Sequence, residues 1–194
     1  MGLLLLAACS PGEPKAQPQG ATVPTAAPTT TTTNPYAVPP VIDAAYVNRV
    51  LAGLDAVFGD AFRLMVSTRT VSTESLDRLK AVYGDGDLLN LQLKVVQDNL
   101  LFDRAKIPAN PGDKRTWIDT LISASATCIF ASVDRDYSAV TGVASPFRRE
   151  WIALRPLATA SDPNRYNSTG WAYTYEGFDP NRQPPATSPC ATAS

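Results

Sequence analysis

The sequence predicts an α+β protein in which N-terminal helices pack on a curved antiparallel sheet. Helical periodicity runs from about residue 41 to residue 105, and from Thr116 onward the chain is dominated by alternating, aromatic and β-branched stretches. Helices that precede the strands, instead of alternating with them, indicate two segregated layers. Apolar residues form 44% of the 194 residues, which is enough for one core. We therefore expect a single domain over residues 41–180.

The first helix has the most regular pattern. It begins behind Asp43, a residue type that caps helix N-termini. Apolar residues then recur at steps of three and four, as on one face of an amphipathic helix. These residues are Val47, Val50, Leu51, Leu54, Val57, Phe58, Ala61, Phe62 and Met65. Asp55 and Arg63 fall between them.

A second helix is expected from Ser72 to the turn at Gly84, with Glu74 in the first turn where the helix dipole favours an acid. The next stretch, 86–105, is open between two interpretations. Alternation of Leu89, Leu91, Leu93 and Val95 with polar residues is the pattern of a strand. The spacing of Leu88, Leu91, Val95 and Phe102 is that of a helix. The residue types Leu, Gln and Lys favour the helix.

Four strands are predicted at 117–122, 128–133, 151–155 and 170–176. The last has the clearest alternation, which places Trp171, Tyr173 and Tyr175 on one face and Ala172, Thr174 and Glu176 on the other. The three aromatic residues could form a platform that stacks a flat ligand, or they could be the core face of the sheet.

Composition excludes several classes of function. The chain has no histidine, which removes Ser-His-Asp and Cys-His catalysis and His-ligated zinc. Its 17 basic and 18 acidic residues are dispersed, so no nucleic-acid surface is expected. No phosphate loop or metal-ligand spacing is present, and we expect no cofactor and no metal.

Two short motifs have both a functional and a structural interpretation. Asp134 and Asp136 flank Arg135 at the end of a strand and could do acid–base work, although aspartate is also common at strand ends. Asn167-Ser168-Thr169 matches an N-glycosylation sequon and equally a turn before the last strand. Neither motif specifies a reaction.

The first nine residues resemble a bacterial lipoprotein signal. Leu6-Ala7-Ala8-Cys9 is similar to a lipobox, in which an apolar residue and two small ones precede the cysteine that receives the lipid. The resemblance implies that Cys9 is lipidated and that the protein is held at the cell membrane, facing outside the cytoplasm. Met1-Gly2 has no basic residue and the apolar run 3–8 is shorter than the usual roughly 7–15 residues. Two interpretations stay open: the true start lies upstream of Met1, or the match to a lipobox is accidental.

The segment behind Cys9 has the composition of a linker. Residues 10–40 are rich in proline and threonine and contain few large apolar groups, which predicts a disordered spacer between membrane and domain. If Cys9 is lipidated, Cys128 and Cys190 remain as a pair, and an oxidising compartment favours a disulfide over two separate thiols. That bond would tie down the irregular tail, residues 181–194.

The order of a long helix, two further helices and a sheet ending in an aromatic strand resembles the NTF2-like superfamily of cone-shaped α+β domains. The lipobox, the Thr/Pro linker, the Ala-rich composition and the preference for Arg over Lys together resemble actinobacterial lipoproteins. In NTF2-like families the cone can hold a small-molecule pocket, whose mouth would here be lined by some of Trp151, Trp171, Tyr173 and Tyr175. Some enzymes of that superfamily use a His-Asp pair. This chain has no histidine, so the resemblance does not imply that activity here.

These observations predict a lipid-anchored binding or accessory module of the cell envelope, whose partner is an envelope protein or a small molecule. Two alternatives stay open. One is a carboxylate-based hydrolase or lyase, with Asp134 and Asp136 as its acids. The other is a structural subunit of a secretion or conjugation assembly.

Overall fold

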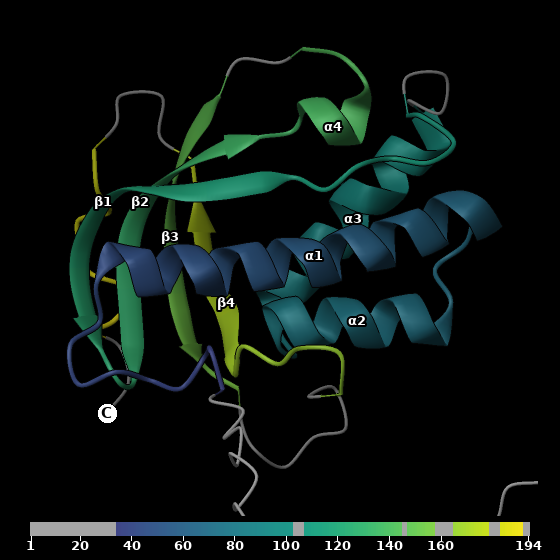
Figure 1. Cartoon of the computed structure of the whole chain (residues 1–194). Coiled ribbons are helices and arrows are strands. Elements are labelled where there is room, and N and C mark those ends of the chain that lie inside the picture. The colour runs from purple at the N-terminus through teal and green to yellow at the C-terminus, as the bar shows by residue number, and fades with distance from the viewer. Residues whose placement is uncertain (1–33, 103–106, 145–146, 158–164, 179–182, 192–194) are drawn as a thin grey trace, which may run out of the picture. The chain divides into compact units, whose positions relative to one another are not determined.

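The computed structural model describes residues 34–102, 107–144, 147–157, 165–178 and 183–191. All of them belong to one compact unit, Thr33–Ser194. Cys9, the lipobox and the linker up to residue 33 lie outside the described residues. Three helices come first, α1 (Ala44–Thr68), α2 (Thr73–Tyr83) and α3 (Asp87–Phe102), and a sheet follows (Figure 1). The predicted α+β class is confirmed.

Helix α1 follows the sequence pattern closely. The Asp43 side chain accepts the N–H of Tyr46 at 2.7 Å and so caps the helix, as predicted. All nine apolar positions of the predicted stripe are buried. In Figure 1 the helix lies across one face of the sheet, which it covers.

Helix α2 begins and ends where the sequence predicts. The Ser72 hydroxyl accepts the N–H of Ser75 at 3.2 Å, and Gly84 ends the helix with φ 66°, a conformation that favours glycine. The ambiguous stretch that follows is helical, which resolves the choice left open for 86–105 as far as Phe102.

The prediction that this stretch is a helix was right, but the apolar stripe that indicated a helix is not the stripe that is buried. Leu89, Val96 and Leu100 are buried, whereas Leu91 and Val95 are 54% and 45% exposed. The sequence of α3 carries two overlapping apolar stripes, and α2 and β4 (Trp171–Gly177) contact the one that includes Leu89. Packing against neighbours, which periodicity does not encode, selected the face.

The sheet is an antiparallel meander in the order β1-β2-β3-β4. Its other strands are β1 (Arg115–Ser125), β2 (Cys128–Asp136) and β3 (Arg148–Pro156), and a short helix, α4 (Ser138–Thr141), lies between β2 and β3. All four predicted strands are present. The core face of β2 and β3 carries Ile129, Ala131, Val133, Ile152 and Leu154.

The alternation predicted for β4 fails at one point. Leu154 of β3 pairs with Tyr173, but the neighbouring Ala153 pairs with Tyr175, so Thr174 is an extra residue in a β-bulge. Opposite residues in an antiparallel pair point to the same face. Tyr175 therefore lies on the outer face, and Glu176, the partner of the buried Ile152, lies on the core face.

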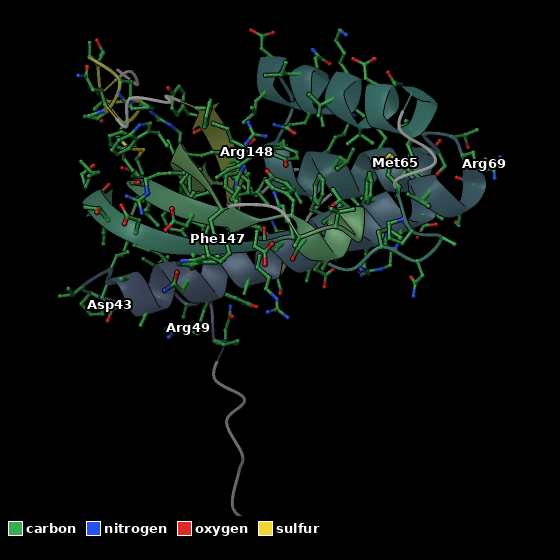
Figure 2. The ribbon with its side chains drawn as sticks, turned by 90° about the horizontal axis from the view of Figure 1, so that it is seen from above. Asp43, Arg49, Met65, Arg69, Phe147 and Arg148 are labelled. Atoms are coloured by element: carbon green, nitrogen blue, oxygen red, sulfur yellow. A yellow bond between two sulfur atoms is a disulfide. The ribbon has the colours of Figure 1, made fainter. Side chains whose placement is uncertain are left out.

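The predicted disulfide is confirmed. Cys128, at the start of β2, is bonded to Cys190 of the tail with a Cα–Cα distance of 5.7 Å. Because Ile129 faces the core, Cys128 faces outward, and the tail lies on the opposite side of the sheet from α1 (Figures 1 and 2). Among the described residues, no helix combines the length and the hydropathy needed to cross a membrane.

Candidate functional site

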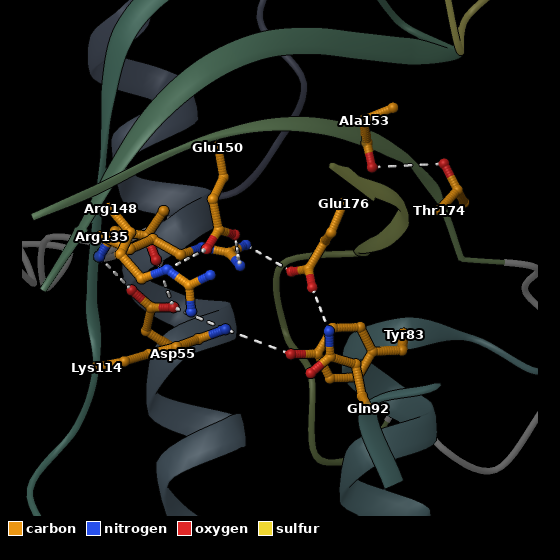
Figure 3. A network of polar contacts seen from close by, with 11 residues as sticks. Asp55, Tyr83, Gln92, Lys114, Arg135, Arg148, Glu150, Ala153, Thr174 and Glu176 are labelled. Carbon is orange, nitrogen blue, oxygen red and sulfur yellow. Dashed lines mark hydrogen bonds and ion pairs between the residues drawn. The ribbon is translucent and has the colours of Figure 1, made fainter. Parts of the chain in front are cut away.

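Five charged side chains are buried between α1 and the core face of the sheet. Each is less than a tenth exposed, and each comes from a different part of the fold (Figure 3). We call this group the interior cluster; it consists of Asp55 of α1, Lys114 before β1, Arg135 of β2, Glu150 of β3 and Glu176 of β4. Charged residues are almost never fully buried unless they are paired, so the cluster is the first place to look for a function.

Local structure explains why these residues point inward. Asp55 lies four residues after Leu51 and three before Phe58, inside the apolar stripe of α1. Arg135 continues the inward alternation of Ile129, Ala131 and Val133, and Glu150 begins that of Ile152 and Leu154. These signals were available in the sequence and were missed. Glu176 had no such signal, because only the bulge turns it inward.

Asp55 is bound on both oxygens. Its Oδ2 accepts the backbone N–H of Thr116 at 2.7 Å, and its Oδ1 accepts the Thr116 hydroxyl at 3.0 Å. The ammonium of Lys114 lies 3.7 Å from Oδ1. Burial raises the pKa of Asp55 above its ordinary value, although the charges of Lys114 and Arg135 act in the opposite direction.

Lys114 is enclosed by aromatic rings. Its Nζ lies 4.5 Å from the ring centroid of Phe58, 5.3 Å from that of Tyr173 and 5.8 Å from that of Tyr83. It donates one hydrogen bond, of 3.4 Å, to the Tyr83 hydroxyl. Burial lowers the pKa of Lys114, and the nearby guanidinium of Arg135 lowers it further. The faces of the three rings partly replace the water that the ammonium has lost.

Arg135 connects two carboxylates. One terminal nitrogen donates to Glu150 Oε2 at 2.6 Å, and the other donates to Glu176 Oε1 at 2.5 Å. The side-chain amide of Gln92, on α3, donates to the remaining oxygen of Glu176 at 2.6 Å. Burial alone would lower the pKa of Arg135, but the two glutamates hold it well above its ordinary value.

Two polar atoms of the cluster region have no hydrogen-bond partner among the described residues: Arg135 Nε and the Tyr173 hydroxyl. Both side chains are at most 2% exposed. Burial raises the pKa of Tyr173, and the nearby Arg135 guanidinium opposes that rise. Buried polar atoms are almost always paired, so the Arg135 Nε–H, a donor, and the Tyr173 hydroxyl, a donor and an acceptor, mark a place where a further hydrogen-bond partner would fit.

The structure does not bring the four predicted aromatic residues to one mouth. Trp171 and Tyr173 belong to the core, where the Trp171 indole N–H donates to the Tyr46 hydroxyl at 2.8 Å. Trp151 lies on the outer face against Phe130, with ring centroids 5.9 Å apart. Tyr175 is also on the outer face. Of the four, only Tyr173 contacts the interior cluster.

Asp134 and Asp136 lie away from the cluster, and Arg135 between them points to the opposite face. Asp134 accepts two hydrogen bonds from Arg149, at 2.9 and 3.1 Å. Asp136 accepts the N–H of Ser138 at 2.8 Å, and hydrogen bonding by the side chain and the backbone of Ser138 lowers the pKa of Asp136. The two carboxylates thus have separate structural partners and share neither a proton nor a cation.

Asn167, the asparagine of the sequon, has a structural role. The side-chain amide of Asn167 is 3% exposed and donates to the carbonyls of Ala81 and Trp171, at 2.5 and 2.8 Å, so it organises the turn before β4. Within the part of the chain that the structure describes, no group of three acidic or cysteine side chains could hold a metal ion.

No protein-family model, no curated protein and no solved structure matches this chain.

Proposed function

We propose that this protein is a lipid-anchored binding or accessory module on the outer side of the cell membrane. The disulfide between Cys128 and Cys190 supports an oxidising compartment, because such bonds persist outside the cytoplasm and are rare within it. The lipobox-like sequence ending at Cys9 supplies the anchor, and the Pro/Thr-rich residues 10–40 supply the spacer.

We further infer an NTF2-like cone for the domain. Three helices followed by a four-stranded antiparallel meander, with α1 across one face, support that arrangement. In such a cone the interior cluster lies between the long helix and the sheet.

One observation carries the binding function: Arg135 Nε and the Tyr173 hydroxyl are buried polar groups with no hydrogen-bond partner among the described residues. A small molecule that presents an oxygen acceptor, such as a carbonyl or a carboxylate, would satisfy both. Leaving such groups unpaired costs about 1–3 kcal/mol each, which is the free energy that a suitable acceptor would recover.

A carboxylate-based hydrolase or lyase is the second candidate, and it now depends on Asp55 instead of Asp134 and Asp136. Asp55 with a raised pKa beside Lys114 with a lowered one is the pattern of an acid–base pair. Binding is the better supported function, because both oxygens of Asp55 already accept hydrogen bonds from Thr116.

The test compares protein that is isolated with its ligand and protein from which the ligand has been stripped. The full chain is purified from its own membrane fraction, and half is unfolded, dialysed and refolded. We expect the native half to melt at a higher temperature and to release a small molecule, detected by mass spectrometry, when it is unfolded. Tyr173→Phe, which removes only the unpaired hydroxyl, should bring the native half close to the stripped one.

Tyr166→Phe is the matched control, because it removes a tyrosine hydroxyl from a residue that lies beside Arg78 and Arg165, outside the interior cluster. It should leave the difference between the two halves unchanged. The proposal fails if the halves melt alike and Tyr173→Phe raises the melting temperature of both, since the hydroxyl would then be a buried group without a ligand. It also fails if Tyr173→Phe destabilises both halves equally, which would mean that the hydroxyl bonds directly to Arg135.

A further inference from the structure

The tail forms a second site on the outer face of the sheet, away from the interior cluster. Two of the following contacts join it to the sheet, and the third lies within the tail. Cys190 is bonded to Cys128, Arg155 donates to the carbonyl of Pro189 at 3.0 Å, and the Ser188 hydroxyl accepts the N–H of Cys190 at 3.2 Å. A further backbone bond, from Ala191 N–H to the Ser188 carbonyl at 2.9 Å, closes a turn. The tail is thus a defined wall that is tied to the sheet.

A groove of about 360 Å³ lies between this wall and the strands. We call it the tail groove; it is lined by Arg155 of β3, Thr174 and Tyr175 of β4, and Thr187, Ser188 and Pro189 of the tail. Its volume is at the lower end of the range for small-molecule sites, which is about 300–1,000 Å³.

The lining combines one aromatic ring with several hydrogen-bonding groups. Ser188 uses its hydroxyl oxygen as an acceptor for Cys190, so its hydroxyl hydrogen remains available to a ligand. Thr174 donates weakly, at 3.4 Å, to the Ala153 carbonyl and keeps its lone pairs (Figure 3). Thr187 is exposed at the rim.

The bulge in β4 is what brings the ring to the groove. Without the extra residue Thr174, Tyr175 would have followed the predicted alternation into the core. Gly177, two residues later on the same face, leaves space for the ring, because a side-chain carbon there would collide with the Tyr175 hydroxyl. Two local features therefore cooperate to place one half-buried tyrosine beside the hydroxyl groups.

We propose that the tail groove binds a saccharide. A sugar ring has one apolar face, which stacks on an aromatic side chain, and a rim of hydroxyl groups, which exchange hydrogen bonds with hydroxyls and a guanidinium. Tyr175 supplies the first, and Thr174, Thr187, Ser188 and Arg155 supply the second. The disulfide is part of this site, since Cys190 holds three of the lining residues in place.

The experiment uses the full chain carrying Cys9→Ser, so that lipid does not interfere. Glucose, maltotriose, N-acetylglucosamine and its β1,4-linked tetramer are each titrated while saturation-transfer NMR and calorimetry record binding. We expect at least one of them to bind in about the millimolar range or tighter. Tyr175→Ala should weaken that binding about tenfold or more, and Cys190→Ala, which releases the tail, should abolish it.

Tyr166→Ala is the matched control, because Tyr166 is also half-buried but lies near Arg78 and Arg165, outside the groove. It should bind the same sugar with unchanged affinity. Thermal melting of every variant checks that the domain is folded. The proposal is overturned if no sugar binds, if Tyr175→Ala binds as tightly as the parent chain, or if inorganic phosphate alone binds, through Arg155 and the hydroxyls. These results are independent of Tyr173, so they separate this site from the interior one.

Discussion

At the scale of single residues, Asp55 shows how a charge can occupy a position that periodicity assigns to the core. Its carboxylate and the Asn48 side chain accept the N–H groups of Thr116 and Ile118, at 2.7 and 2.8 Å. These donors belong to β1, an edge strand whose one neighbour among the described strands is β2. Unpaired donors on an edge invite other strands, so α1 protects the edge that it covers.

The raised pKa of Asp55 predicts that the stability of the protein depends on pH. Its pKa is raised above 3.8 in the folded protein, so the folded state holds this proton more tightly than the unfolded state does. The stability that this group contributes is therefore complete below pH about 3.8 and is lost as the pH rises through the raised pKa. We measure the free energy of unfolding with urea for the parent chain and for Asp55→Asn. As the pH rises through that interval, the value for the parent chain should fall relative to that of Asp55→Asn. A difference that is constant with pH would contradict this prediction.

At the scale of elements, the bulge in β4 decides which side chains reach the two candidate sites. One extra residue, Thr174, sends Tyr175 to the tail groove and Glu176 to Arg135. Bulges re-aim side chains in this way and are common next to functional sites. The strand would otherwise have buried an aromatic residue and left the buried Arg135 with a single carboxylate.

Alanine substitutions in β4 test the bulge directly. Glu176→Ala leaves Arg135 and Gln92 without their shared partner and should destabilise the protein by about 3–5 kcal/mol. Tyr175→Ala removes a half-buried ring from the outer face and should cost about 1 kcal/mol. Denaturant titration measures both. Regular alternation without a bulge would reverse the order, with Tyr175→Ala the more damaging change.

Helix α3 offers a second test at this scale, because its two apolar stripes differ in exposure. Leu89 is 4% exposed and Leu91 is 54% exposed. Leu89→Ala should destabilise the protein by about 2–5 kcal/mol, since it creates a cavity. Leu91→Ala, the same chemical change on the other stripe, should stay within about 0.5 kcal/mol of the parent chain. Equal effects would show that the helix packs in a different rotation.

At the scale of the whole molecule, the fold has two differently covered sides. The three helices cover the core face of the sheet, and the tail, held by one disulfide, lies against the outer face. The interior cluster depends on the first of these contacts and the tail groove on the second. The two candidate sites can therefore be disturbed independently.

Removal of the disulfide measures what the tail contributes. The bond joins residues separated by 62 positions, and closing a loop of that length stabilises a protein by about 4 kcal/mol in the chain-entropy model. Reduction should lower the free energy of unfolding by up to that amount, as measured by urea titration with and without reductant. Cys9→Ser should not change the result, whereas Cys190→Ala should reproduce the effect of reduction without any reductant. Unchanged stability on reduction would count against the bond.

Much of the fold was predictable because its elements depend on local patterns. The stripe of α1, the caps at Asp43 and Ser72, the stop at Gly84 and the four strands follow from residue spacing and turn chemistry. The sites were less predictable. The inward positions of Asp55, Arg135 and Glu150 follow the periodicity of their elements, but the sequence does not show that these three side chains meet.

The sequence by itself determined the order of helices and strands, the absence of histidine chemistry and the cysteine pair, because each depends on residue type and spacing along the chain. Tertiary structure alone decided which stripe of α3 is buried, which residues of β4 face inward, and that five charges from five segments meet in one place. Those outcomes depend on contacts between segments far apart in the chain. The bulge at Thr174 is the clearest case, since nothing in the strand's own alternation predicts it.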